Sequence, residues 1–510
     1  MHSIREIQWS STAITPTRTA PHRKMNVNST APRSRIDVSP RRTMVAAQPH
    51  RRKAAQSSDS THFLRTAVRL LLVCTLIFAA FSTFQRQPVA GADNECPPNI
   101  GYQPECQYRP FYTPPDPLPA GAPGDLIRTE PSRIALDPAG HGNYSGTGTR
   151  LMYQSINARG EAVAVTGTYF EPNNPWPGGG PRPLIAFAPF QQGLGDQCAI
   201  SRLVSEGGMH YGGYLDFVFY FEAGFLATML DRGFALVVTD YQGTGTYGPP
   251  TGGIRIPTAN AVIDSARAAK RLPNTSLDPN GPVAFWGYGP GGTAAGAAVE
   301  LAPSYAPELD VVGAWVGAPN ADYSIYAEHA DASLMVGTMG YALNSFIGAY
   351  PEAEQAIRDV LTPRGIDFLE KTRYNCVDEV IMKFMFRHLQ PYFNRDYREI
   401  INSEPIKSGL AAQRLGSLKP TAPVQIDINR FDPLIPWAGA RQLAADWCAR
   451  GADVEFWTNE QPPFLNKTAT NNMLTYFVEG ERGMHWIADR FNGLPTTPNC
   501  SNLPPFELPQ

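Results

Sequence analysis

The sequence lacks the features that would assign it to several common classes of protein. Only 17% of its 510 residues are charged. Its glycine-rich runs are not followed by Gly-Lys-Ser/Thr, which excludes a P-loop for nucleotide phosphates. It has no C-x-x-C or clustered Cys/His spacing, so we predict neither a metal nor another cofactor. Beyond residue 92 there is no run of about 18 apolar residues, so we expect no membrane span in the mature chain.

The net charge of −3 averages two unlike regions. Residues 1–69 hold 13 Lys/Arg against 3 Asp/Glu, whereas the rest of the chain holds 30 against 43. Nucleic acids are bound through basic surfaces, so the acidic body argues against a nucleic-acid partner. The hydrophobic fraction of 43% is that of a globular protein with enough chain for a large core.

The N-terminal part predicts a tail followed by a secretion signal. Residues 1–69 form a basic head without apolar periodicity, which indicates either a disordered tail or a stretch upstream of a true start at Met44. We assign residues 70–92 to a signal peptide, because a run of about 15 apolar residues precedes an A-x-A cleavage site. The secreted chain would then begin at Asp93; an uncleaved signal anchor is the alternative.

The body of the chain alternates predicted strands and helices. Strands are predicted at 150–155, 162–169, 183–190, 234–240, 283–288, 311–316, 424–428 and 454–457, and helices at 221–232, 260–272, 291–301, 438–450 and 483–491. This alternation is typical of an α/β fold with a mostly parallel sheet flanked by helices. After a proline-rich arm at 93–123, we expect the core at 124–319 and 416–510. Long helical stretches at 332–350 and 377–393 predict an inserted helical cap at 320–415.

The most informative segment is a strand that enters a tight glycine-rich turn and then a helix of small residues, Phe285–Thr293. This is the setting of the nucleophile elbow G-x-S-x-G, in which a serine lies on a strained turn above the sheet of an α/β-hydrolase. Here the central position is Gly289, and no G-x-S-x-G occurs anywhere in the chain. Glycine has no nucleophilic atom, and it also relieves the strain of the turn.

Several blocks of residues 120–500 resemble the secretory lipases of fungi and actinobacteria. The resemblance implies an α/β-hydrolase fold with a helical cap and a serine, acid and histidine triad. It rests on the segments Asp196–Ala199, Thr239–Gly245, Glu300–Leu309 with Val311–Gly313, and Trp486–Gly493 running on to Asn499 and Cys500.

The resemblance places the three triad positions on Gly289, Asp432 and Asn472. Asp432 retains the acid, in a loop after a predicted strand, whereas Asn472 stands where the family has its histidine. An amide does not titrate and cannot act as the base, so both nucleophile and base are missing. The strand end Pro189–Gly193 also departs from the family, which tends to have a His-Gly pair there.

Other side chains could be proposed as replacements. His485 could be a displaced base, but within an apolar helical segment we interpret it as a half-buried structural histidine. Ser201 and Thr293 could be nucleophiles, but neither lies on the elbow. We interpret Asp240 and Asp322 as structural.

Cysteine usage agrees with export. Cys74 lies within the signal, and six cysteines remain, which in a secreted chain indicates disulfides. The resemblance implies the pairs Cys198–Cys376 and Cys448–Cys500, which leaves Cys96 with Cys106.

Two hypotheses of function follow. The first is a secreted, inactive lipase homologue that binds a lipid or acyl chain. The second is an active secreted triacylglycerol lipase or carboxylesterase with an unconventional catalytic set. A third, structural, hypothesis is a cell-surface protein with an empty pocket.

Overall fold

The computed structural model describes residues 110–213 and 215–506. The basic head, the signal, most of the proline-rich arm and the pair Cys96–Cys106 lie outside the described residues. One nine-stranded sheet has the order β1-β2-β3-β7-β4-β8-β9-β10-β11. Its strands are β1 Leu126–Ser132, β2 Gly146–Ile156, β3 Ala162–Pro172, β4 Leu184–Ala188, β7 Ala235–Thr239, β8 Val283–Tyr288, β9 Val311–Gly317, β10 Val424–Asn429 and β11 Val454–Asn459.

The sheet is antiparallel from β1 to β7 and parallel from β7 to β11, which confirms the predicted mostly parallel α/β fold. Strands β4, β7 and β8 are buried along their whole length. Their sequences are nearly continuous apolar runs, because helices cover both faces of a parallel sheet. Parallel strands end at the same edge, so the loops after β4, β8 and β10 meet there.

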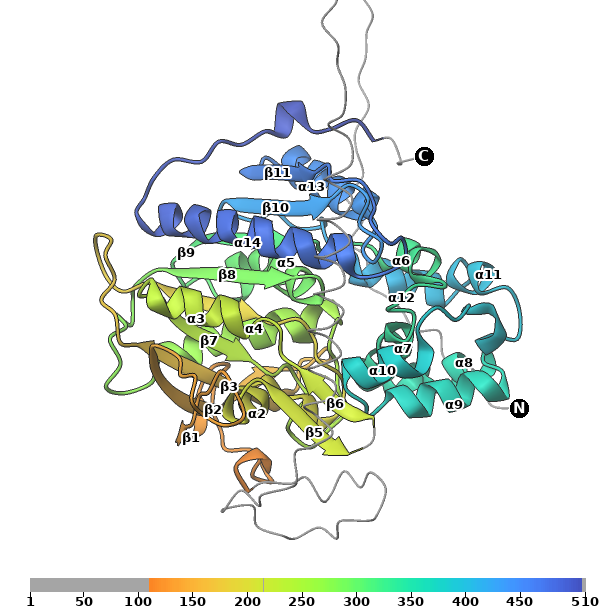
Figure 1. The fold of residues 1–510 in the computed structure, drawn as a ribbon, viewed down its shortest axis with the longest axis horizontal. Helices are drawn as coiled ribbons and strands as arrows, with labels where there is room; N and C mark the ends of the chain where they lie inside the picture. The colour runs from red at the N-terminus through yellow and green to blue at the C-terminus, as the bar shows by residue number, and fades with distance from the viewer. Residues whose placement is uncertain (1–109, 214, 507–510) are drawn as a thin grey trace, which may run out of the picture. The chain divides into compact units, whose positions relative to one another are not determined.

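Figure 1 shows helices on both faces of the sheet: α3 and α14 cover one face, and α4, α5 and α13 cover the other. Their bounds are α3 Ala223–Asp231, α4 Arg255–Lys270, α5 Pro290–Tyr305, α13 Trp437–Ala449 and α14 Thr470–Phe491; the short α2 is Ile200–Ser205. Two predicted starts are wrong. Helix α4 begins before Asn260, because Pro257 lies in its first turn, where no intrahelical N–H bond is needed. Helix α14 begins long before Gly483, because its interior glycines pack against Phe225 and Trp315.

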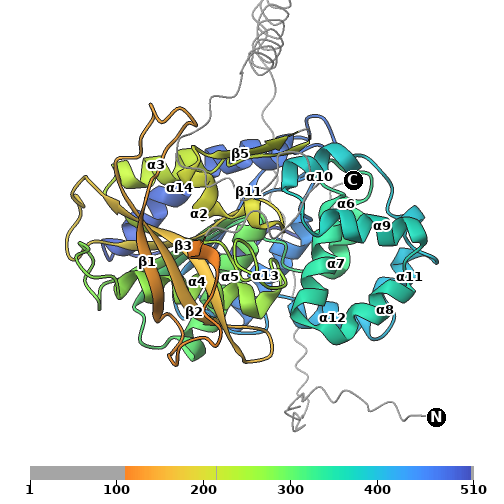
Figure 2. The same ribbon diagram turned by 90° about the horizontal axis from the view of Figure 1, so that it is seen from below.

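Between β9 and β10 lies the helical insertion, which contains helices α6 to α12. They are α6 Tyr323–Ala330, α7 Thr338–Ala349, α8 Glu354–Asp359, α9 Pro363–Thr372, α10 Val377–Phe384, α11 Tyr397–Ile401 and α12 Ile406–Gln413. The two long helices predicted there are shorter: α10 ends before Phe386, whose φ of 61° is incompatible with a helix. Figures 1 and 2 show the insertion at the end of the sheet toward which β8 and β10 point.

Two of the predicted disulfides are present. Cys198–Cys376 ties the loop after β4 to the start of α10, and Cys448–Cys500 ties α13 to the C-terminal segment. A two-stranded sheet, β5 Met209–Gly213 with β6 Asp216–Phe219, lies apart from the main sheet and was not predicted. Within the described residues, none of the helices has the length and apolarity needed to cross a membrane.

Candidate functional site

Gly289 lies on the turn between β8 and α5. Its backbone has φ 58° and ψ −122°, which is a strained conformation for a residue with a Cβ atom. Gly291 allows the close approach of β4, because a Cβ atom there would lie 2.2 Å from the carbonyl oxygen of Ala188. The turn therefore has the geometry of a nucleophile elbow. Glycine at position 289 permits the positive φ, and glycine at position 291 permits the close approach of β4.

The space above Gly289 is partly filled by an aromatic ring. A Cβ atom built on Gly289 would lie 3.0 and 3.1 Å from two ring carbons of Phe190, which is buried in the loop after β4. The backbone N–H of Phe190 donates to Glu222 at 2.7 Å, so this loop is fixed from below. Burial raises the pKa of Glu222 to about 8. A side chain at Gly289 would require the Phe190 ring to shift by a few tenths of an ångström.

The residues predicted at the acid and base positions, Asp432 and Asn472, meet in space. The Asn472 amide donates to Oδ2 of Asp432 at 2.7 Å, and the backbone N–H groups of Leu434 and Ile435 donate to Oδ1 at 2.8 and 2.9 Å. All three donors are neutral. Burial raises the pKa of Asp432 to about 6. Tyr288, next to Gly289, donates its hydroxyl to the carbonyl oxygen of Asn472 at 2.7 Å, which joins the end of β8 to the first turn of α14.

A further difference at the elbow was overlooked in the sequence. In α/β-hydrolases the backbone N–H of the residue after the nucleophile is one donor of the oxyanion hole. Here that residue is Pro290, which has no N–H. Proline suits the first position of α5, where its fixed φ is already helical. The sequence shows a proline directly after Gly289, and from that position the missing N–H donor could have been predicted.

None of the histidines in the described part of the chain is hydrogen-bonded to the Asp432 carboxylate. His485 lies on the outer side of α14, with its side chain 69% exposed and 3.0 Å from Glu481; the interpretation as a half-buried histidine was wrong. No sequence pattern pointed to His329, in α6, whose Nε2 donates to the backbone carbonyl of Asp432 at 2.8 Å. Burial lowers the pKa of His329, so its ring is neutral at physiological pH.

Ser201 and Thr293 have structural hydrogen bonds. The Ser201 hydroxyl donates to Asp240 at 2.5 Å and contacts the Tyr112 hydroxyl at 2.9 Å in a buried cluster. Thr293 accepts from the backbone N–H of Asn320 at 2.8 Å, which links α5 to the loop after β9. Asp322 caps α6 by accepting from Ser324. These contacts agree with structural roles for all four predicted side chains.

Gly289 and Asn472 line one small cavity, which we call the elbow cavity. Its volume is about 70 Å³, room for about two waters. Part of its wall comes from the core, and the rest comes from the helical insertion, through Tyr323, Tyr326, Met335, Thr338, Tyr341 and Ala342. The Gln191 amide nitrogen, which also belongs to a lining residue, is buried without a hydrogen-bond partner among the described residues. In this conformation the cavity has no room for an acyl chain.

The sheet, the elbow and the acid after β10 define the α/β-hydrolase fold. The profile of the secretory lipase family matches residues 216–499. The chain belongs to the secretory lipase family.

Relatives agree with this assignment. The chain is 26% identical over 400 residues to a secreted triacylglycerol lipase of Malassezia furfur, covering 77% of each chain. It is 27% identical over 390 residues to a protein of Mycobacterium tuberculosis named as a probable inactive lipase, covering 76% of this chain and 83% of that one. Both active and inactive names therefore occur among its relatives.

Solved structures share the fold. Lipase A of Candida antarctica matches with a TM-score of 0.65 and 22% identity, covering 77% of this chain and 88% of that chain. The rice cell wall degrading esterase of Xanthomonas oryzae matches with a TM-score of 0.59 and 17% identity, covering 72% and 98%.

Proposed function

We propose that this member of the secretory lipase family does not hydrolyse esters and instead binds a lipid or acyl chain. The observation that carries the proposal is the Asp432–Asn472 hydrogen bond. It puts a non-titrating amide where the acid of a triad would orient an imidazole. Without a base, a hydroxyl or water at this position cannot be deprotonated in the usual way.

The two residues on the elbow turn itself, Gly289 and Pro290, support the same conclusion. Gly289 supplies no nucleophile, and Pro290 supplies no oxyanion donor. Loss of the serine alone typically lowers the rate by about 10⁶, and further triad losses then add little. Loss of an oxyanion donor typically lowers the rate by about 10²–10³. Family membership supports the second half of the proposal, because lipid is the substrate class in the names of its relatives.

Two observations favour the alternative, an active esterase with an unconventional catalytic set. The neutral His329 ring contacts the Asp432 loop, and the Gln191 amide nitrogen has no hydrogen-bond partner among the described residues. However, His329 binds a backbone carbonyl and is not among the residues that line the elbow cavity. A shift of α6 would be needed to bring its ring to Gly289.

Hydrolysis of a short p-nitrophenyl ester by the purified secreted chain separates these functions. We expect turnover no faster than the buffer control, and no change on His329→Ala. Turnover that His329→Ala or Asp432→Ala abolishes would establish the alternative. Native mass spectrometry and solvent extraction test for bound lipid; a protein that takes up none would point to the structural, empty-pocket hypothesis.

The same proposal includes export by the signal at residues 70–92. The disulfides and the secreted relatives support it, because disulfides persist in oxidising compartments. N-terminal sequencing of the protein from culture medium should begin at Asp93. Retention in the membrane fraction at full length would indicate the uncleaved anchor instead.

A further inference from the structure

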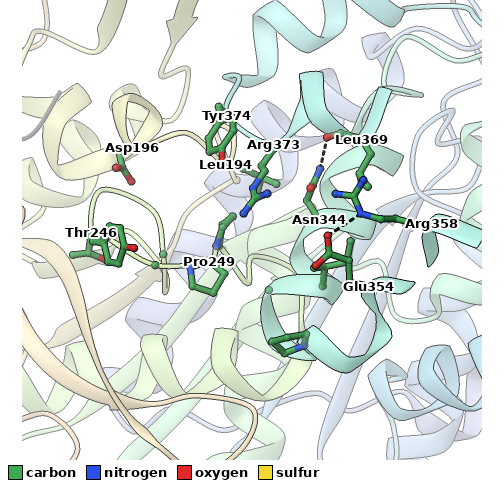
Figure 3. Close-up of a pocket in the computed structure, with 17 residues that line it drawn as sticks. Leu194, Asp196, Thr246, Pro249, Asn344, Glu354, Arg358, Leu369, Arg373 and Tyr374 are labelled. Atoms are coloured by element: carbon green, nitrogen blue, oxygen red, sulfur yellow. Dashed lines mark hydrogen bonds and ion pairs between the residues drawn. The ribbon is translucent and has the colours of Figure 1, made fainter. Parts of the chain in front are cut away.

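A second, much larger cavity lies elsewhere in the molecule. We call it the Arg373 cavity; its volume is about 740 Å³, within the range of about 300–1,000 Å³ that is typical of small-molecule sites. Figure 3 shows it between the loop after β7, the loop after β4 and helices of the insertion. Its wall therefore combines the core with the helical insertion.

Helix α7 separates this cavity from the elbow cavity. Thr338, Tyr341 and Ala342 line the elbow cavity, whereas Asn344, Ile347 and Gly348 line the Arg373 cavity. The two cavities share no lining residue. A ligand in the larger cavity would therefore not need the elbow to open.

The wall of the Arg373 cavity contains one cation without a carboxylate partner. Arg358 is engaged, since it contacts both Glu354 and Glu370 at 2.8 Å. Arg373 has no ion pair within the described residues, and its guanidinium lies 5.3 Å from the ring centre of Tyr374. Figure 3 shows the Arg373 side chain pointing between Pro249 and Asn344. A planar guanidinium with free donors is suited to binding a carboxylate in a bidentate manner.

The rest of the wall is mostly apolar. Leu194, Pro249, Pro250, Ile347 and Leu369 all line the cavity. The wall also contains Asp196; burial raises its pKa to about 6, against the charge of Arg202 and the backbone N–H of Gly245, which both favour its charged form. Asp196 comes from the loop after β4 and Arg373 from the end of α9, so the wall is polarised between its two sides.

We propose that the Arg373 cavity binds a single-chain amphipathic carboxylate, with the carboxylate on Arg373 and the alkyl chain along the apolar wall. This proposal deepens the proposed function and rests on its lipid-binding half. It moves the ligand away from the elbow, where about 70 Å³ is too little for an acyl chain. It requires no catalytic group.

Titration of the secreted chain with monomeric oleate in a calorimeter tests the proposal. Arg373→Gln should weaken oleate binding by about tenfold or more, because it removes a charge-assisted hydrogen bond. Arg364→Gln is the matched control, since Arg364 lies on the same helix and also stacks on a tyrosine, Tyr392, but does not line the cavity. It should bind oleate as the parent does. Methyl oleate has no carboxylate, so its affinity should be the same for the two variants.

Two further variants assign the cavity. Ile347→Trp should fill the Arg373 cavity and abolish oleate binding, whereas Ala342→Phe should fill the elbow cavity and leave it unchanged; circular dichroism confirms that both fold. No oleate binding, equal binding by the two arginine variants, or loss of binding in Ala342→Phe alone would overturn the proposal. If the protein hydrolyses esters and also binds oleate through Arg373, this proposal stands. In that case only the first half of the proposed function, that the protein does not hydrolyse esters, is overturned.

Discussion

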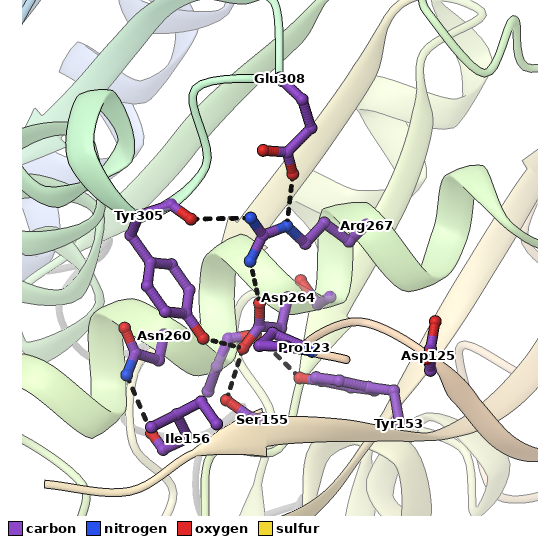
Figure 4. Close-up of polar contacts among 12 residues, drawn as sticks. Pro123, Asp125, Tyr153, Ser155, Ile156, Asn260, Asp264, Arg267, Tyr305 and Glu308 are labelled. Carbon is purple, nitrogen blue, oxygen red and sulfur yellow. Dashed lines mark hydrogen bonds and ion pairs between the residues drawn. The ribbon is translucent and has the colours of Figure 1, made fainter. Parts of the chain in front are cut away.

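Asp432 in the loop after β10 and Asp264 in α4 are two buried carboxylates in unlike surroundings. Burial raises the pKa of each to about 6. Asp432 is held by two backbone N–H groups and the Asn472 amide. Asp264 accepts from the hydroxyls of Ser155 and Tyr305 and from Arg267, as Figure 4 shows.

The difference lies in the charge of the partners. Arg267 also contacts Glu308 at 2.6 Å and the backbone carbonyl of Tyr305 at 2.7 Å, so it joins α4 to the end of α5. In that network the charge of the buried Asp264 is balanced by the charge of Arg267, and the carboxylate oxygens have hydrogen-bond donors. A structural cluster of buried polar groups requires both. Among the residues that the structure describes, no cation pairs with Asp432. If Asp432 holds the acid position as proposed, it lacks the imidazole that such an acid would orient.

The largest effect is expected from breaking the Asp264 cluster. Arg267→Ala leaves a buried carboxylate without its cation and should lower the free energy of unfolding by about 3–5 kcal/mol. Urea denaturation at pH 7 measures it. Arg271→Ala is the control, because its ion pair with Asp125 is exposed and is worth about 1 kcal/mol or less. Equal losses in the two variants would show that the cluster is not a structural unit.

The second effect concerns rate at the elbow. Gly289→Ser alone should stay inactive, because the base is missing. Gly289→Ser with Asn472→His should give a trace of ester hydrolysis, and adding Pro290→Ala should raise it by about 10²-fold by restoring an N–H donor. A p-nitrophenyl ester assay measures all three. Turnover from Gly289→Ser alone would mean that the base position is not Asn472.

The third effect is the pH dependence that the two carboxylates share. A carboxyl whose folded pKa is raised favours the fold below its unfolded pKa of about 4, and this stability is lost as pH rises through about 6. Asp432→Asn stays neutral, so at pH 7 it should gain on the order of 1–2 kcal/mol relative to the parent, compared with pH 4. Asp264→Asn should change in the same direction between pH 4 and pH 7, because the folded pKa of Asp264 is also raised to about 6 with Arg267 beside it. Unfolding of both variants and the parent at the two pH values tests the sign; a stability relative to the parent that falls from pH 4 to pH 7 in either variant would contradict it.

The smallest effect is expected at His485. Because its side chain is exposed and Glu481 is its one ion-pair partner within the described residues, His485→Ala should change the free energy of unfolding by less than about 0.5 kcal/mol. It should also leave the oleate affinity unchanged. A larger change would show that the outer side of α14 contributes to the fold.

Much of the sheet could be predicted, because buried parallel strands are apolar runs of the right length between glycines and prolines. The starts of α4 and α14 could not, since Pro257, Gly480 and Gly483 are helix breakers by local rules. Tertiary contacts override those rules: Gly480 and Gly483 lie where the Phe225 and Trp315 rings leave no room for a side chain. The hairpin β5–β6 was missed because its glycines and polar residues carry no strand pattern.

For the candidate site, the positions of Gly289, Asp432 and Asn472 came from local motifs and the family resemblance, and their roles remain predictions. The contact of His329 with the Asp432 loop had no sequence signal, because 103 residues separate the two. The Arg373 cavity had none either, since its wall is assembled from four separate segments. The missing N–H donor at Pro290 could have been predicted from the sequence, because proline has no backbone N–H and follows Gly289 directly.

The sequence by itself determined that the chain has a strand, a glycine turn and a small-residue helix, and that no serine stands on that turn. These are local properties, set by residue volume and backbone freedom within a few positions. Only the tertiary structure decided that Asn472 meets Asp432, that Phe190 covers Gly289, and that α7 divides a small cavity from a large one. Such contacts join segments far apart in the chain, and they form only when the sheet and the helical insertion pack together.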